Sequence, residues 1–131
     1  MDWFSRYVIA WELSTTMEAD FCVRCLQRAL ETRRPEIFNT DQGSQYTSDD
    51  FTRVLSAAEV QISMNGAGRC FDNIMVERLW RTVKQEEVYL KDYESVLDCR
   101  ANLAAFFERY NHRRRHSSLK ARPAEIYFEA N

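Results

Sequence analysis

Hydrophobic and polar residues follow one another in blocks whose spacing changes along the chain. Residues 7–13 (YVIAWEL) are aromatic and β-branched and predict a strand. Residues 15–18 (TTME) predict a capping box that starts a helix. From Cys22 to Leu30 the apolar residues recur at spacings of three and four, so the helix is expected to end near Thr32.

The middle of the chain alternates short apolar runs with a second helical pattern. Residues 37–39 and 60–64 predict two short strands, and the first is expected to be buried. Between them, Ser48 begins a predicted helix that reaches about Ala58, with Asp50 in its first turn. This order of strands and helices predicts an α/β fold with parallel strand pairing.

The second half of the chain is predicted to be mainly helical. Residues 65–71 (NGAGRCF) hold two of the three glycines and predict a mobile loop. Long helices are predicted near residues 72–89 and 93–110, and a basic tail follows. We expect one domain, with core strands and helices in residues 1–89 and a C-terminal helix and basic tail in residues 90–131.

Composition places the chain among ordinary globular proteins. Hydrophobic residues make up 45% and charged residues 29% of the 131 positions, enough for one domain with its own core. No apolar run approaches the ~20 residues that a membrane span needs, and the opening lacks a signal-peptide pattern. We therefore expect a cytoplasmic protein with no membrane partner.

The cysteines and tryptophans are interpreted as core residues. Cys22 and Cys25 form a CxxC pair, but both lie on the apolar stripe of a predicted helix, which favours packing over a zinc or redox site. Trp3, Trp11 and Trp80 are likewise assigned to the core and not to platforms on which bases stack.

Charge is distributed unevenly along the chain. The net charge is −2, which is not that of a general nucleic-acid binder. Residues 107–122 nevertheless contain six basic residues and one acidic residue. This stretch is consistent with contact to a polyanion along one edge of the protein, and equally with a solvated tail.

Two acidic residues are candidates for chemistry. Asp41 directly follows a predicted strand and precedes Gly43, and α/β folds place ligand chemistry at the carboxyl ends of parallel strands. An aspartate that starts a turn is the commoner explanation. Glu77 shares one face of a predicted helix with Arg81 and Lys84, within about 60° at ~100° per residue. An ordinary Glu–Arg pair on a solvated face remains the alternative.

Three motifs in order make the chain resemble a known family. The stretches are TDQGSQYTSDDF (40–51), ISMNGAGRCFDNIMVERLW (62–80) and YNHRRRHSSLKARP (110–123). With the 35 residues between Asp41 and Glu77, they resemble the second-Asp, Glu-helix and C-terminal signatures of insertion-sequence-three family transposases. That family belongs to the DDE group with the retroviral integrases. The opening MDWFSR is similar to the family's second and third core strands.

The resemblance implies a ribonuclease-H-like integrase core in which two Asp and one Glu hold two Mg²⁺ or Mn²⁺ ions for phosphoryl transfer. Asp41 matches the second Asp and Glu77 the Glu, so we expect their carboxylates within about 8 Å of each other. No residue matches the first Asp, and Asp2 lies in a motif away from the metals. The expected fold is therefore an N-terminally truncated core whose first strand is missing.

The resemblance also implies contact with DNA, both the element ends and the target. Lys84 matches a position that faces the DNA end, and Arg81 is expected to contact phosphate. The other candidates for DNA contact are Arg69, Arg113, Arg114, Arg115 and His116. The pattern YNxxRxHxxL gives Tyr110, Asn111, Arg114 and His116 a packing or DNA role. We expect an oligomer with other transposase chains in the bacterial cytosol or nucleoid.

Two functions from different classes remain open. The chain is either the catalytic core of a transposase, active when the missing strand is supplied, or a non-catalytic remnant that at most binds DNA or a transposase partner. A generic ribonuclease-H-type nuclease is a weaker third interpretation, because the C-terminal motif favours a transposase.

Overall fold

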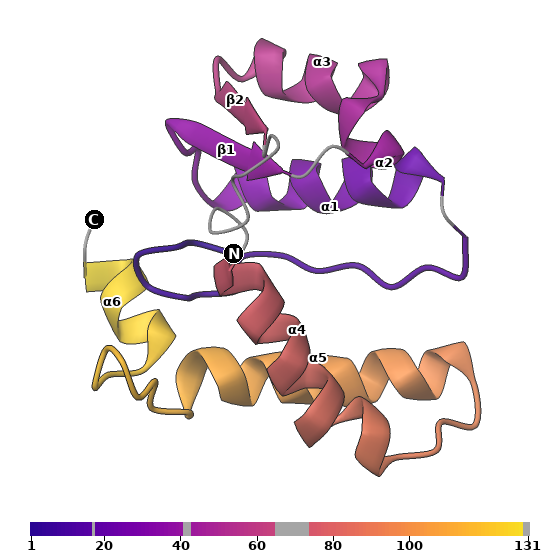
Figure 1. Cartoon of the computed structure of the whole chain (residues 1–131), viewed down its shortest axis with the longest axis vertical. Coiled ribbons are helices and arrows are strands. Elements are labelled where there is room, and N and C mark those ends of the chain that lie inside the picture. Colours follow the sequence, from indigo (N-terminus) through magenta and orange to yellow (C-terminus); the bar gives the residue numbers. More distant parts are fainter. Residues whose placement is uncertain (17, 41–42, 65–73, 130–131) are drawn as a thin grey trace. The chain divides into compact units, whose positions relative to one another are not determined.

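The computed structural model describes residues 1–16, 18–40, 43–64 and 74–129 (Figure 1). The chain divides into two compact units. The sheet unit is Ile9–Ile74, and the helical unit combines Met1–Val8 with Met75–Asn131. Each unit has buried apolar residues of its own, so each is held together by its own core.

The sheet unit is a small α/β arrangement. Its elements are α1 (Ala19–Thr32), β1 (Ile37–Thr40), α2 (Ser44–Thr47), α3 (Asp49–Ala57) and β2 (Gln61–Met64). The strands β1 and β2 pair in parallel, with Ile37 opposite Gln61 and Thr40 opposite Met64. The strands predicted at residues 37–39 and 60–64 and their parallel pairing are confirmed. The expected burial of the first strand was wrong in part, because Ile37 is 56% exposed and Thr40 is the buried residue of β1.

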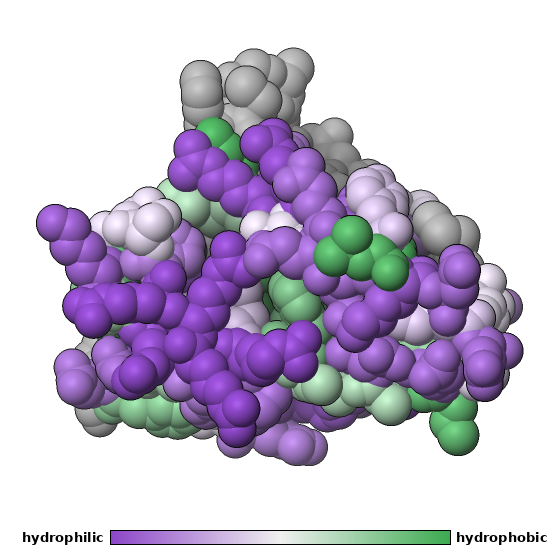
Figure 2. Space-filling model, turned by 90° about the horizontal axis from the view of Figure 1, so that it is seen from below, coloured by the Kyte–Doolittle hydropathy of each residue, from purple (hydrophilic) through white to green (hydrophobic). Residues whose placement is uncertain are grey.

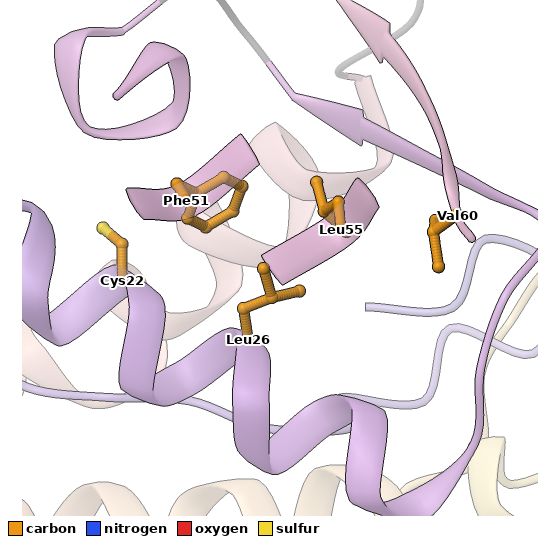
Figure 3. Close-up of a cluster of buried hydrophobic side chains, with 5 residues drawn as sticks. All are labelled: Cys22, Leu26, Phe51, Leu55 and Val60. Atoms are coloured by element: carbon orange, nitrogen blue, oxygen red, sulfur yellow. The ribbon is translucent and has the colours of Figure 1, made fainter. Parts of the chain in front are cut away.

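The core of the sheet unit lies between α1 and α3 (Figure 3). Cys22 and Leu26 project from α1 toward Phe51 and Leu55 of α3, and Val60 closes the cluster beside β2. The spacing of four residues within each pair places both side chains on one helix face. The apolar stripe predicted for the first helix is therefore the face that is buried.

Of the two cysteines of α1, Cys22 belongs to this packing. Cys22 and Cys25 are free; Cys22 is buried and Cys25 is partly buried. Burial raises the pKa of both thiols, which disfavours the thiolate that metal binding or redox chemistry would use. The packing interpretation is confirmed for Cys22, whereas Cys25 is not part of the core cluster.

Local hydrogen bonds explain which predicted helix starts were right. The Ser48 Oγ accepts a hydrogen bond from the Phe51 N–H at 3.3 Å, so Ser48 caps α3 as predicted. The capping box at residues 15–18 was wrong: α1 begins at Ala19, and Glu18 is its N-cap without a side-chain hydrogen bond. The Thr16 N–H instead bonds to the Ser14 Oγ, at 3.1 Å.

Among the described residues, the helical unit contains one more α-helix than predicted. Its elements are α4 (Ile74–Glu86), the short 3₁₀ helix η2 (Val88–Leu90), α5 (Val96–His112) and α6 (Pro123–Glu129). α6 was missed because its residues were interpreted as part of the basic tail. Pro123 stands at its first position, where the missing N–H and fixed φ of proline suit a helix start.

α6 packs against the opening of the chain. The Tyr127 ring of α6 stacks on Tyr7, with 4.5 Å between ring centroids and 7° between planes. Phe128 and His112 meet the same Tyr7 ring edge-on. The first eight residues are thus fixed to α5 and α6 by aromatic contacts.

Residues 7–13 do not form the predicted strand. Within the described part of the chain, β1 and β2 make up the sheet, and no strand is assigned to residues 7–13. Val8 instead bonds through its backbone to the side chain of Asn111, at 2.9 and 3.0 Å. A side-chain amide therefore takes the place that a neighbouring strand would occupy at this residue.

The tryptophan prediction was also wrong in part. Trp3 is 42% exposed and Trp80 is 49% exposed, so neither is a core residue. On the face drawn in Figure 2, hydrophobic side chains reach the surface at separate places among mostly hydrophilic ones. Half-exposed tryptophans are therefore part of a largely polar exterior.

Some predictions fall outside the described residues. The loop at residues 65–71, with Arg69 and Cys70, is among them, and so is Asp41. The division of the domain at residue 89 stays a prediction. No helix in the described ranges is long and apolar enough to cross a membrane.

Candidate nucleic-acid interface and metal site

α4 divides its surface between the core and solvent. Leu79 and Val83 are buried, whereas Glu77, Arg81 and Lys84 are exposed. At ~100° per residue the three charged side chains lie within about 60° of one another, roughly opposite the buried pair. The predicted grouping of one carboxylate and two cations on one helix face is therefore present.

Among the described residues, these three charges have no partner. Neither a hydrogen bond nor an ion pair joins the side chains of Glu77, Arg81 or Lys84 to any other described residue. The alternative of a Glu77–Arg81 ion pair is thus not realised. Exposed charges with no partner in the described part of the chain are candidates for contact with a ligand.

The structure describes the strand that precedes Asp41 but not Asp41 itself. β1 ends at Thr40, so Asp41 directly follows the carboxyl end of a parallel strand, as predicted. The Asn39 Oδ1 and Thr40 Oγ1 atoms are buried and have no hydrogen-bond partner among the described residues. The Asp41–Glu77 distance lies outside the described residues.

The donor set suits a hard cation. The candidate ligands are carboxylates, and the buried atoms beside Asp41 are also oxygens, which are the ligands that Mg²⁺ prefers. The described residues contain no group of three His, Cys, Asp or Glu side chains that could hold a metal. Glu77 fits a ligand role because its carboxylate is exposed and has no described partner.

A buried carboxylate anchors the end of α4. Glu87 is 0% exposed, and its carboxylate accepts hydrogen bonds from Lys91 Nζ at 2.9 Å and from the Tyr93 hydroxyl at 2.6 Å. Burial, followed by the hydrogen bond to Glu87, raises the pKa of Tyr93. Lys91 also donates to Asn102 of α5, at 3.0 Å. Sequence analysis missed this network. The spacing of four residues between Glu87 and Lys91 is the sequence pattern that could have indicated it.

The basic residues after α5 differ in what they contact. Arg114 forms an ion pair with Glu86 of α4 at 2.6 Å, and both side chains are about half exposed. Arg113 and Arg115 are exposed, and their side chains have no partner among the described residues. Of this predicted DNA-binding run, Arg113 and Arg115 are the freer to contact a ligand.

Asn111 has a packing role. It is 7% exposed, its Oδ1 accepts from the Val8 N–H, and its Nδ2 donates to the Val8 carbonyl. Tyr110 beside it is also buried. The packing interpretation of the YN pair is therefore confirmed, because both polar groups of Val8 depend on this one amide.

His116 lies in a cationic environment. Its Nδ1 accepts from the Ser118 N–H at 3.3 Å, and its backbone N–H donates to the Ala121 carbonyl at 2.9 Å. Burial lowers the pKa of His116, and so do the positive charges of Arg6, Arg114 and Arg78. The opening segment, α4 and the segment after α5 therefore each supply one arginine to this region.

The order of the motifs and the parallel α/β arrangement of the sheet unit agree with an integrase core. The integrase core domain family matches residues 1–70, and a second family of the same description matches residues 58–123. The chain belongs to the integrase core domain family.

Its curated relatives are transposases of insertion sequences. The transposase for IS904 of Lactococcus lactis is 32% identical over 123 residues, which are 91% of this chain and 49% of the relative. The transposase InsF for IS3A of Escherichia coli K12 is 37% identical over 121 residues, which are 89% of this chain and 42% of the relative. The predicted resemblance to insertion-sequence-three transposases is confirmed. The chain spans less than half the length of these relatives.

Solved structures confirm the ribonuclease-H-like fold. The catalytic core domain of BIV integrase aligns with 96% of this chain and 80% of its own, at a TM-score of 0.75 and 20% identity. A simian T-cell lymphotropic virus intasome, solved with a PP2A regulatory subunit, aligns with 87% of this chain at a TM-score of 0.66 and 15% identity. Likenesses at these identities establish the fold alone.

Replacing Asn111 by leucine should destabilise the helical unit. The change leaves the buried Val8 N–H and carbonyl without partners, which costs about 1–3 kcal/mol for each group. Chemical denaturation would measure the loss, and hydrogen exchange should show that the Val8 amide is no longer protected. Gln85→Leu, at an exposed position of α4, is the control. Unchanged Val8 protection in Asn111→Leu would contradict the role assigned to this amide.

His116 should make stability depend on pH. Its pKa is lower in the folded protein than the ordinary 6.5, so below pH 6.5 the unfolded chain binds the proton first. The free energy of unfolding should therefore fall as pH drops through 6.5, and this contribution should level off below the folded pKa. His116→Gln should flatten the curve in that window. Curves of equal steepness for the parent and His116→Gln would refute this.

Proposed function

We propose that this chain is part of the catalytic core of an insertion-sequence transposase, which transfers DNA strands by metal-dependent phosphoryl transfer. Asp41 and Glu77 are the two carboxylates that it contributes to the metal site. The observation that carries the proposal is the exposed face of α4, where Glu77 lies beside Arg81 and Lys84 with no described partner.

Each side chain of this face has a distinct task. Glu77 offers oxygen ligands, and bound Mg²⁺ or Mn²⁺ would supply activation of the attacking oxygen and charge stabilisation at the phosphate. Arg81 and Lys84 hold phosphate groups of the DNA next to the carboxylate. Leu79 and Val83 are buried on the opposite side of α4. The helix that carries Glu77, Arg81 and Lys84 is therefore held in place by packing.

DNA is the expected partner of the other unpaired cations as well. Arg113 and Arg115 are exposed and lie within the three residues before His116, so they add exposed positive charge to the helical unit. Phosphate contacts of this kind position a duplex without reading its sequence. Element ends and target DNA are the proposed substrates, and other transposase chains are the proposed partners in an oligomer.

The alternative is a non-catalytic protein that at most binds DNA or a transposase partner. It is supported by the exposed cations of α4 and of the segment after α5, which can contact phosphate without a metal ion. Both proposals use the same cations for DNA. They differ in whether Asp41 and Glu77 hold a metal ion.

The purified 131-residue chain should bind DNA without cleaving it. Two carboxylates leave the site short of one ligand, and each 1.36 kcal/mol of lost transition-state stabilisation costs about tenfold in rate. Binding should persist, with a steep dependence on salt, because phosphate contacts need no metal. Arg81→Ala and Lys84→Ala should each reduce the slope of log K against log salt by about 0.9. Binding isotherms at several salt concentrations and a labelled DNA end would measure both.

The control for binding is Arg53→Ala, which removes an exposed arginine of α3 in the sheet unit. The control for cleavage is Asp41→Asn. Metal-dependent nicking by the parent that disappears in Asp41→Asn would contradict the expected inactivity. If the parent, Arg81→Ala and Lys84→Ala have equal slopes of log K against log salt, α4 does not contact DNA phosphates.

A further inference from the structure

Trp80 of α4 is left half in water, although the sequence pattern assigned it to the core. It is 49% exposed, and its ring makes no aromatic contact with another described residue. A tryptophan buries a large apolar surface when a fold can use it. The described residues bury only part of the Trp80 surface.

The position of Trp80 on α4 places it beside the proposed DNA face. At ~100° per residue Trp80 lies about 60° from Glu77 and about 40° from Lys84. On its other side the next residues along the helix surface are Val76, half-buried, and Val83, buried. The indole therefore stands at the border between the core and the charged face.

The neighbours of Trp80 determine which ligand suits its ring. Lys84 and Arg81 are exposed cations without partners among the described residues, and the carboxylate of Glu77 is committed to the proposed metal. A protein partner would need further apolar side chains around the tryptophan, and on this face it has charged ones instead. An aromatic ring beside exposed cations is typical of surfaces that bind a nucleic-acid strand.

The structure of duplex DNA limits which bases can stack on Trp80. Within a duplex, both faces of every base are covered by its stacked neighbours, so a protein ring can stack only on a terminal or unpaired base. We propose that Trp80 is a stacking platform for an unpaired base at a DNA end, next to the phosphates held by Arg81 and Lys84. This inference rests on the proposed function, because it assumes that α4 faces DNA.

The test compares two DNA probes with the same 131-residue chain. One probe is a blunt duplex, and the other carries a short unpaired overhang at one end. The parent should prefer the overhang, and Trp80→Ala should lose roughly tenfold in affinity for it, within the range expected for one stacked base. Trp80→Phe should retain most of the preference, because it keeps an aromatic face.

Trp3 provides a matched control, since it is 42% exposed in the same unit but lies outside α4. Trp3→Ala should keep the preference for the overhang. A chain with Trp3 and Trp11 changed to phenylalanine retains Trp80 alone, and its fluorescence should be quenched by the overhang probe more than by the blunt duplex. Thermal melts of each variant establish that it is folded.

The outcomes separate this inference from the proposed function. If Trp80→Ala keeps the preference of the parent, the stacking role is overturned. The proposed function still stands in that case if Arg81→Ala and Lys84→Ala weaken binding to both probes. If Trp80 is shielded from iodide in the DNA-free chain, another part of the protein covers the ring and the inference fails.

Discussion

The proposed site depends on one constraint, which is that α4 must bury one face and leave the other exposed. Leu79 and Val83 satisfy the first requirement, and Glu77, Arg81 and Lys84 satisfy the second. A carboxylate that is to bind a metal cannot also be used up in an internal ion pair. The absence of such a pair among the described residues keeps Glu77 available.

The rest of the helical unit holds α4 in place. Glu87 lies buried directly after the helix and accepts hydrogen bonds from Lys91 and Tyr93, while Lys91 reaches Asn102 of α5. Buried carboxylates are costly unless their oxygens are hydrogen-bonded, so both bonds are needed where they are found. The Glu86–Arg114 pair adds an exposed and therefore weaker link.

What the sequence could predict follows from how local each signal is. The Ser48 cap, β1, β2 and the stripe of α1 were predicted because a few neighbouring residues decide them. Residues 7–13 have strand-forming side chains, but at Val8 the partner is the Asn111 side chain, 103 positions away. α6 and the exposure of Trp80 also depend on contacts between distant segments. The charged face of α4 was predictable from helical spacing. The sequence could not predict that Glu77, Arg81 and Lys84 form no ion pair with another described residue.

Binding of Mn²⁺ to the ¹⁵N-labelled chain, followed by NMR, tests the central claim most directly. Mn²⁺ broadens the amide signals near its site. Signals around Glu77 and signals around Thr40 and Gly43 should broaden together. Glu77→Gln and Asp41→Asn should each weaken both effects, because both carboxylates are proposed as ligands of the metal site. Broadening at only one of the two places, or broadening unchanged in both variants, would contradict the proposed site.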